Sequence, residues 1–284
     1  MILIVDSGST KSDWILLNNS IQTHYSTMGL NPYFHDEETV YTAIKNQKEL
    51  FSIREEVEKV FFYGAGCSSE SLNLIIQNGL SKVFSKATIT VDHDLCACAY
   101  ATYEGEPSIS CIIGTGSNSC YYDGNEIFEE VPALGYILGD EGSGTYFGKQ
   151  LLSNFLYKRL PLHIHEAFLK ETGITKDEIV DNVYMQPNAN VYLASFMRFI
   201  IKFQDDDYIK EMIYNGFKHF IQIHVCCYSN YKSVKVHFVG SIAHLFISEL
   251  DKACSVMDVQ LGKVIQKPID GLVSYHENLL IHSN

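Results

Sequence analysis

Basic residues are scarce in this sequence, and long apolar runs are absent. The 284 residues include 21 Lys and Arg against 34 Asp and Glu, a formal net charge of −13 at pH 7. Such a chain has no basic stripe to neutralise phosphates, which argues against nucleic acid or an anionic membrane surface as a partner. No apolar run approaches the roughly 20 residues that span a bilayer. The N-terminus also lacks the basic stretch of a signal peptide, so we expect a cytoplasmic protein.

Several catalytic and metal-binding motifs are missing as well. The eight cysteines contain no CxxC pair, which leaves a zinc or iron–sulfur site without support. There is no HExxH metalloprotease motif and no GxSxG elbow for acyl transfer. A P-loop, GxxxxGK[ST], and a GxGxxG turn that opens a helix are absent too. A Walker ATPase and a Rossmann dehydrogenase are therefore disfavoured.

The first stretch with a chemical signature covers residues 2–17. It predicts a buried strand that ends at Asp6, a tight turn, and a second strand over residues 14–17. The turn consists of small and hydroxylic residues, Ser7-Gly8-Ser9-Thr10. Glycine lets the backbone approach a ligand closely, consecutive N–H groups bind anions, and hydroxyls add donors. We interpret this turn as a phosphate site, although a plain hairpin has the same pattern.

A similar unit recurs after residue 107. Residues 110–113 and 120–122 predict two strands, and the turn between them contains Gly114-Thr115-Gly116-Ser117-Asn118. Aligning Asp6 with Gly114, an offset of 108 residues (114 − 6), places Gly8 on Gly116. Internal repetition of this kind indicates two related domains.

The remaining pattern indicates an α/β protein. Helices are predicted over residues 37–51, 71–83 and 95–103, with strands over 60–63 and 87–91 between them, so parallel crossovers follow the opening hairpin. Helices dominate after residue 146, including one over residues 194–204. The best boundary falls at residues 104–107, which predicts domains 1–107 and 108–268 and a terminal helix, 269–284, that can rejoin the first domain.

Three carboxylates stand where strands end or in glycine turns: Asp6, Asp94 and Asp140. A kinase needs carboxylates to accept a proton from the attacking hydroxyl and to hold Mg²⁺. Asp140 lies in the segment 139–144, which has three glycines and precedes a helix whose N-terminus attracts anions. Gly240-Ser241-Ile242-Ala243 stands at a strand-to-helix junction, a plausible place for a nucleoside in an α/β fold.

Together these segments resemble the actin/Hsp70/sugar-kinase superfamily. Within it they are similar to the family that joins N-acetylglucosamine kinases to the ATPase activators of benzoyl-CoA reductase. The turn with Lys11 resembles the first phosphate motif, usually DGGGTK, with Ser7 and Ser9 in place of two glycines. The turn at Gly114 matches the second phosphate motif, residues 139–143 match the GDEGS segment, and residues 240–243 resemble the adenosine loop. His93-Asp94 takes the place of an Asn-Asp pair that carries the catalytic base.

The resemblance implies two ribonuclease-H-like domains that face a nucleotide cleft, with ATP and Mg²⁺ as cofactors. It implies that Asp94 is the catalytic base, with Asp92 as a competitor for that role, and that Mg²⁺ lies near Asp6. The residues that it assigns to ATP are Gly8, Ser9, Thr10, Lys11, Gly114, Thr115, Gly116, Gly240, Ser241 and Ala243. Those that it assigns to the sugar are Asn31, Asp94, Ser117, Asn118, Gly135 and Asp140.

The expected activity is transfer of the γ-phosphate of ATP to the 6-hydroxyl of an amino sugar, first of all N-acetylglucosamine. Glucosamine, N-acetylmuramic acid and glucose are further candidate substrates. One alternative is an ATPase that activates a partner redox enzyme, although no cysteine here has the glycine-flanked setting of a cluster ligand. The other is a nucleotide-binding regulator without transfer activity. The resemblance further implies a homodimer.

Overall fold

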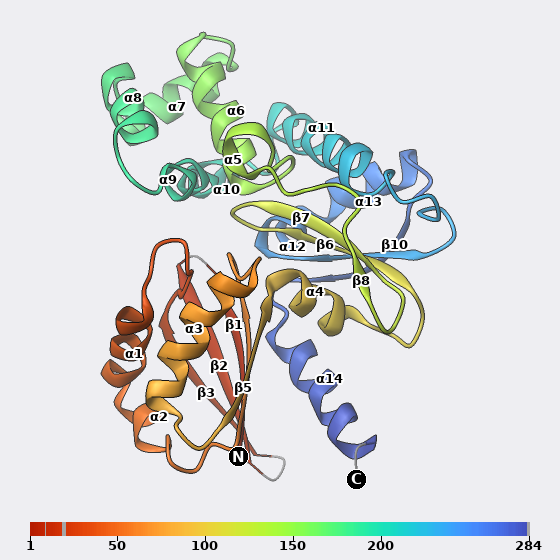
Figure 1. The fold of residues 1–284 in the computed structure, drawn as a ribbon. Coiled ribbons are helices and arrows are strands. Elements are labelled where there is room, and N and C mark those ends of the chain that lie inside the picture. Colours follow the sequence, from red (N-terminus) through yellow and green to blue (C-terminus); the bar gives the residue numbers. More distant parts are fainter. Residues whose placement is uncertain (9, 19–20, 283–284) are drawn as a thin grey trace. The chain divides into compact units, whose positions relative to one another are not determined.

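Two compact units make up the chain: Met1–Glu104 with Lys267–Asn284, and Gly105–Gln266. The structure, a computed structural model, describes residues 1–8, 10–18 and 21–282 (Figure 1). Within these residues no helix has the length and apolarity needed to cross a membrane. Each unit is a five-stranded mixed sheet with helices, which confirms the predicted α/β class.

The sheet of the first unit has the strand order β3-β2-β1-β4-β5. Strand β1 lies at its centre, antiparallel to β2 and parallel to β4. The alternation of Leu3 and Val5 with Ile4 and Asp6 sends two side-chain rows to opposite faces of the sheet. The strands are β1 (Ile2–Ser7), β2 (Lys11–Asn18), β3 (Ile21–Met28), β4 (Lys59–Gly64) and β5 (Thr88–His93).

Helices cover both faces of this sheet. One face packs Leu3 and Val5 with Trp14 and Phe62 against α1 and α3, and the other meets α4 and the C-terminal helix α14. The helices are α1 (Glu37–Asn46), α2 (Lys48–Ser52), α3 (Glu70–Val83), α4 (Asp94–Thr102) and α14 (Ile269–His282). The single helix predicted over residues 37–51 is wrong, because Gln47 leaves helical geometry and its side chain caps α2.

The second unit repeats the topology of the first. Its strand order, β10-β9-β6-β7-β8, again places an antiparallel hairpin beside a parallel neighbour of the first strand. The repeat matches β6 to β1, so Ser108 corresponds to Ile2 and Ile112 to Asp6, an offset of 106 residues (108 − 2). The predicted offset of 108 is wrong. The strands are β6 (Ser108–Ile113), β7 (Ser117–Tyr122), β8 (Ile127–Phe128), β9 (Lys235–Val239) and β10 (Gln260–Ile265).

Most of the second unit is helical (Figure 1). Its core joins the β6 and β9 side chains to α6, α11 and α13. The helix predicted over residues 194–204 is two helices, α9 and α10, which meet at Phe196. The helices are α5 (Gly135–Leu138), α6 (Gly144–Leu156), α7 (Leu162–Thr172), α8 (Lys176–Tyr184), α9 (Ala189–Ser195), α10 (Met197–Lys202), α11 (Asp207–His224), α12 (Ser241–Leu245) and α13 (Ile247–Val256).

Candidate active site

The turn between β1 and β2 is open to solvent. The Gly8 N–H donates to the Lys11 carbonyl at 3.0 Å, which closes the turn. Gly8 and Thr10 are exposed, and a Cβ on Gly8 would meet only the Lys11 carbonyl oxygen, at 3.7 Å. An anion can therefore approach this backbone freely, as the phosphate prediction requires. Ser9, also predicted to bind phosphate, lies outside the described residues.

Ser7, by contrast, is completely buried at the end of β1. Its Oγ lies 2.7 Å from Ser12 Oγ and accepts a hydrogen bond from the Leu30 N–H at 2.9 Å. Ser12 Oγ in turn donates to the Met28 carbonyl at 2.9 Å. The serine that replaces a family glycine thus faces the interior, where it fixes the segment that leads to Asn31.

Lys11 is held at Asp13, its neighbour on β2. Its Nζ lies 2.5 Å from Asp13 Oδ1, and Lys267 Nζ lies 2.7 Å from Asp13 Oδ2. Burial tends to raise the pKa of Asp13, but the hydrogen bonds from both ammonium groups outweigh it and hold the pKa below its usual range. Two cations therefore stand beside the first turn, of which the sequence pointed only to Lys11.

Asp6 belongs to a row of polar side chains across the sheet of the first unit. It pairs in register with Asp13 on β2 and with Tyr63 on β4, and Tyr63 pairs with Asp92 on β5. Residues in register on neighbouring strands point to the same face. Three carboxylates therefore share this face near the ends of β1 and β5.

The charged form of the Asp6 carboxyl is disfavoured by its surroundings. Burial raises its pKa to about 7, Asp94 and Asp13 push it in the same direction, and Lys267 opposes them. A divalent cation at this carboxylate would offset that cost. No group of three or more potential metal-binding side chains occurs within the described ranges, but Mg²⁺ in kinases uses only one or two carboxylates beside phosphates and waters. Asp6 fits that donor set.

Asp94 is the first residue of α4, where a helix N-terminus favours negative charge. Its side chain is 30% exposed, and its Oδ1 lies 3.0 Å from His93 Nδ1. Asp92 is also half-buried, and burial raises its pKa. Of the two candidate bases, Asp94 is the one whose charge reaches Asp6.

Asn31 is buried, and its orientation is fixed from two sides. Its Oδ1 accepts from the Tyr33 N–H at 2.9 Å, and its own N–H donates to His35 Nδ1 at 3.2 Å. Gly66, in the loop after β4, has φ +84°, and a Cβ there would lie 2.4 Å from Asn31 Oδ1. Gly66 thus makes room for Asn31, a role that the sequence pattern did not indicate.

The turn between β6 and β7 is fastened to the start of α6. The Gly114 N–H donates to the Gly116 carbonyl, and the Gly114 carbonyl accepts from Gly144 N–H, both at 2.9 Å. Thr145 donates to the Thr115 carbonyl through its N–H at 3.1 Å and its Oγ1 at 2.6 Å. A Cβ on Gly114 would meet nothing within 4 Å. An anion can therefore also approach the backbone of this turn, which the hydrogen bonds from Gly144 and Thr145 hold to α6.

Gly240 brings the predicted adenosine loop to the end of β6. It has φ +131°, a conformation that side chains rarely tolerate, and a Cβ would lie 2.2 Å from the Ile113 carbonyl oxygen. Ser241 follows as the exposed first residue of α12, and Ala243 is buried below it. The structure therefore places two predicted nucleotide segments, at Gly114 and Gly240, side by side within the second unit.

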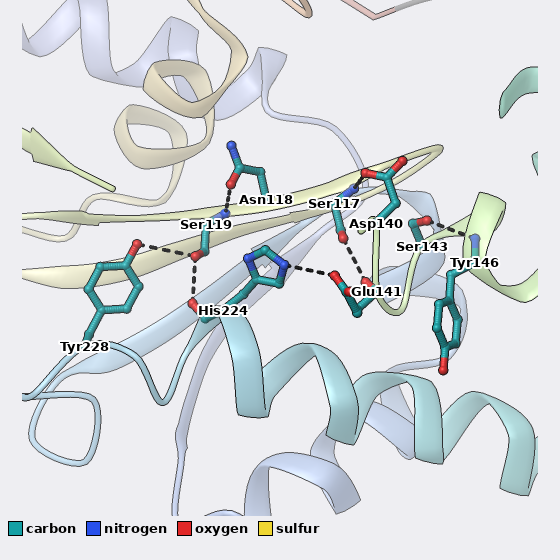
Figure 2. Close-up of polar contacts among 9 residues, drawn as sticks. All are labelled: Ser117, Asn118, Ser119, Asp140, Glu141, Ser143, Tyr146, His224 and Tyr228. Atoms are coloured by element: carbon teal, nitrogen blue, oxygen red, sulfur yellow. Dashed lines mark hydrogen bonds and ion pairs between the residues drawn. The ribbon is translucent and has the colours of Figure 1, made fainter. Parts of the chain in front are cut away.

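Asp140 lies in a separate turn before α6, and its side chain contacts the turn between β6 and β7 (Figure 2). Its Oδ1 accepts from the Ser117 N–H at 3.2 Å, and Ser117 Oγ donates to the Glu141 carbonyl at 2.7 Å. A Cβ on Gly116 would lie 2.9 Å from Asp140 Oδ1, so any larger residue there would have to displace the carboxylate. Burial raises the pKa of Asp140, against the hydrogen bond from Ser117. Asp140, Ser117 and Gly116, all predicted site residues, thus form one cluster.

Two other predicted sugar ligands lie nearby in the chain. Asn118 is buried, its Nδ2 donates to Glu129 Oε2 at 3.3 Å, and its Oδ1 accepts from Ser119 N–H at 2.8 Å. Gly135 is exposed, opens α5 with φ +66°, and accepts from the Gly139 N–H at 2.8 Å. Gly135 therefore reaches the Asp140 turn through the backbone of α5.

Lys149 and His224 are neighbours of this cluster that sequence reasoning missed. Lys149 Nζ donates to the Tyr136 carbonyl, and burial lowers its pKa although Asp140 and Glu141 oppose the change. His224 Nε2 lies 3.2 Å from Glu141 Oε2. Both residues lie on helices outside the motif, Lys149 on α6 and His224 at the end of α11, and only their fold position reveals them.

Comparison with known proteins places this arrangement in a family. The profile of the BadF/BadG/BcrA/BcrD ATPase family matches residues 5–269. A crystal structure from Porphyromonas gingivalis, of a protein assigned as an N-acetylglucosamine kinase, is 35% identical with a TM-score of 0.92, over 98% of this chain and 99% of that one. No curated protein matches the chain.

More distant structures share the fold. A protein from Chromobacterium violaceum, also assigned as an N-acetylglucosamine kinase, has a TM-score of 0.70 at 14% identity over 96% of this chain and 98% of its own. A glucokinase of the ROK family from Streptomyces griseus, in complex with glucose and AMPPNP, has a TM-score of 0.55 at 12% identity over 97% and 98%. The fold is thus that of the actin-like ATPases, and the chain belongs to the BadF/BadG/BcrA/BcrD ATPase family.

Proposed function

We propose that this protein is an ATP-dependent kinase that phosphorylates the 6-hydroxyl of an amino sugar, with N-acetylglucosamine as the first candidate. The observation that carries the proposal is similarity over 98% of the chain to a protein assigned as an N-acetylglucosamine kinase. The site residues support it, because the described part of each predicted phosphate turn has backbone open to an anion. Phosphoryl transfer depends mainly on positioning and electrostatics, which such turns provide.

Asp94 is the proposed base. It is accessible, stands at a helix N-terminus, and is the one of the two candidate bases whose charge raises the pKa of Asp6. In the reaction the sugar 6-oxygen attacks the γ-phosphorus in line, its proton passes to the Asp94 carboxylate, and ADP leaves. Asp92, which is paired in register with Tyr63 and whose pKa is raised by burial, would act as support for this face of the sheet.

The two turns would hold the phosphates through backbone N–H groups and the hydroxyls of Thr10 and Thr115. Asp6 would hold Mg²⁺, directly or through water, and when bound the ion neutralises charge on the β- and γ-phosphates. Lys11 would contribute positive charge from its position at Asp13. Gly240, Ser241 and Ala243 would accept the nucleoside, since Gly240 lies directly against the end of β6.

On the sugar side, Asp140 would use Oδ2 to accept from a hydroxyl, because Oδ1 is occupied by the Ser117 N–H. Ser117, Asn118 and Gly135 would complete this subsite within the second unit. Asn31, in the first unit, is a further proposed sugar ligand. Asp140 and Asn31 are both fixed by hydrogen bonds within the protein. A preorganised polar group of this kind selects between sugars more sharply than an apolar contact does.

The test is an ADP-release assay with ATP and Mg²⁺ on a panel of N-acetylglucosamine, glucosamine, N-acetylmuramic acid and glucose. We expect turnover that depends on an amino sugar, with the product phosphorylated at oxygen 6 by NMR. ATP hydrolysis without sugar would contradict the kinase and favour an activating ATPase, and no turnover with any sugar would favour a regulator. We also propose that the protein is cytoplasmic. On the family resemblance we further propose a homodimer, which sedimentation of the purified protein tests.

A further inference from the structure

The turn that carries Asp140 has an uncommon backbone. Asp140 has φ +61° and Gly142 has φ +68°, so two of three consecutive residues are in the left-handed region. Glycine adopts that conformation freely, whereas a residue with a side chain does so only when surrounding contacts impose it. The contacts that hold Asp140 in this conformation therefore decide where its carboxylate points.

Ser117 supplies one side of that support. Its N–H donates to Asp140 Oδ1 at 3.2 Å, and its Oγ donates to the Glu141 carbonyl at 2.7 Å. These two bonds fasten consecutive residues of the turn to the start of β7. They do not fasten the Glu141 side chain, which leaves the turn on its other side (Figure 2).

The Glu141 side chain ends on His224, the last residue of α11. Glu141 Oε2 lies 3.2 Å from His224 Nε2, and the two side chains are only 13% and 4% exposed. Because a carboxylate oxygen accepts hydrogen bonds, the ring proton lies on Nε2. The other ring nitrogen, Nδ1, then has no proton to donate, and it is buried without a hydrogen-bond partner.

His224 itself is firmly placed. Its ring stacks on Phe220, with the centroids 4.9 Å apart, and its carbonyl accepts from Ser119 Oγ at 2.6 Å. The helix before it, α11, is anchored by fully buried Phe217 and Ile221. Within the second unit a rigid helix end is thus connected to β7 on one side and to the Asp140 turn on the other.

We propose that His224 is a positioning residue for the sugar subsite: through Nε2–H and Glu141 it holds the turn that orients Asp140. This inference rests on the proposed kinase function. It assigns no contact with substrate to His224, which acts only through Glu141. Without that bond the turn keeps its tie to Ser117 but loses its support on the α11 side, and Asp140 relaxes toward ordinary backbone geometry.

The experiment compares His224→Leu with His224→Gln. Glutamine carries an amide N–H at about the reach of Nε2, so it keeps the donor, whereas leucine removes it. For His224→Leu we expect the sugar KM to rise by ~10- to 100-fold, since a displacement of about 1 Å in a binding group costs on that order, with the ATP KM almost unchanged. His224→Gln should recover most of the loss.

Two controls separate positioning from general damage. His276→Leu removes a histidine of the same burial, which pairs with Tyr63 in the first unit, so it reports the effect of a similar loss of stability. A double-mutant cycle of His224→Leu with Glu141→Ala should be strongly non-additive, because both changes break one connection. A sugar KM within twofold of wild type in His224→Leu, equal defects in the Leu and Gln variants, or an equal rise in the ATP KM would each overturn the proposal.

A measurement that needs no kinase activity distinguishes failure of this inference from failure of the proposed function. If the wild-type protein phosphorylates no amino sugar, the proposed function is wrong, and amide hydrogen exchange of residues 139–143 then decides on His224. Faster exchange in His224→Leu, restored by His224→Gln, supports its role in holding the turn. Exchange that does not change in either variant would contradict it.

Discussion

The two hairpins occupy equivalent places in the two units but differ in chemistry. In the first unit β1 ends with Asp6 and a buried Ser7, whereas the equivalent strand, β6, ends with the apolar pair Ile112 and Ile113. The first hairpin thus brings a carboxylate into a row with Asp13. The second brings no carboxylate and relies on Asp140, in a separate turn, for one. The two units therefore share a topology but differ in role. In the proposed reaction the base and the metal ligand both come from the first unit.

One feature is common to both hairpins. Ser12 and Ser117 stand at the same place, opposite the last residue of the first strand. Each hydroxyl donates to the backbone of a later segment, Ser12 to the Met28 carbonyl and Ser117 to the Glu141 carbonyl. Those segments carry the proposed sugar ligands Asn31 and Asp140. Each unit thus has a serine hydroxyl that fastens the loop with a proposed sugar ligand to a predicted phosphate turn.

The largest expected effect concerns Asp94, which has no equivalent base in the second unit. Asp94→Asn keeps the size and the N-terminal position on α4 but cannot accept the proton of the sugar hydroxyl. Transfer should fall by about 10³-fold or more, within the range for loss of an essential base and its charge, while ATP binding and thermal stability stay near wild type. Steady-state kinetics and a thermal melt check this.

The matched control is Asp92→Asn, two residues earlier on the neighbouring strand. Because burial raises the pKa of Asp92 and its charge is not the one that reaches Asp6, we expect a much smaller loss of rate. The reverse order of the two defects would move the base to Asp92.

The next effect separates two glycines, Gly240 in the predicted adenosine loop and Gly8 in the first hairpin turn. A Cβ at Gly240 would stand 2.2 Å from the Ile113 carbonyl oxygen at φ +131°, whereas a Cβ at Gly8 would have 3.7 Å to its nearest atom. Gly240→Ala should therefore cost about 2–4 kcal/mol of stability through strain and overlap with rigid backbone. Gly8→Ala should leave stability nearly unchanged and raise the ATP KM, because the methyl group occupies the approach to the turn. Urea unfolding and ATP titration distinguish the two. Equal stability of both variants would show that the Gly240 loop is able to move aside.

Local features of this site were predictable from the sequence, and distant contacts were not. The glycine and hydroxyl turns were found because strand, turn and strand are consecutive in the chain. The burial of Ser7 was missed, since it depends on Leu30, 23 residues away. The pairing of Glu141 with His224 joins residues 83 apart, and no spacing rule indicates it. The offset of the repeat was wrong because glycines were aligned, while the sheet matches strand ends.

A pH effect is expected in the first unit, where two buried groups act in opposite directions. Asp6, with its pKa raised to about 7, holds a proton in the folded state that the unfolded chain releases, so ionising it lowers stability as pH rises from about 4 to 7. Burial lowers the pKa of His276 to about 4, so its contribution is present above pH 6.5 and is lost as pH falls toward 4.

The two slopes largely offset each other in the wild-type protein, and single variants separate them. Asp6→Asn should leave a stability that rises with pH over this window, and His276→Gln one that falls. Urea unfolding without nucleotide or Mg²⁺, followed from about pH 4.5 to about pH 8, measures both. Parallel curves for the two variants would mean that neither group controls the pH dependence.

The smallest effect concerns the buried serines that tie each hairpin to a ligand-bearing loop. Ser12→Ala removes the donor to the Met28 carbonyl in a buried position, which should cost about 1–2 kcal/mol. Ser117→Ala removes the donor to the Glu141 carbonyl but leaves the Ser117 N–H on Asp140, so we expect a similar loss of stability. The sugar KM should rise by only about two- to fivefold in each, because 1.4 kcal/mol corresponds to tenfold and only part of the lost energy affects the ligand. Were Ser12→Ala to change the sugar KM while Ser117→Ala did not, the two loops would not be fastened in equivalent ways, and the likeness between the hairpins would end at the strands.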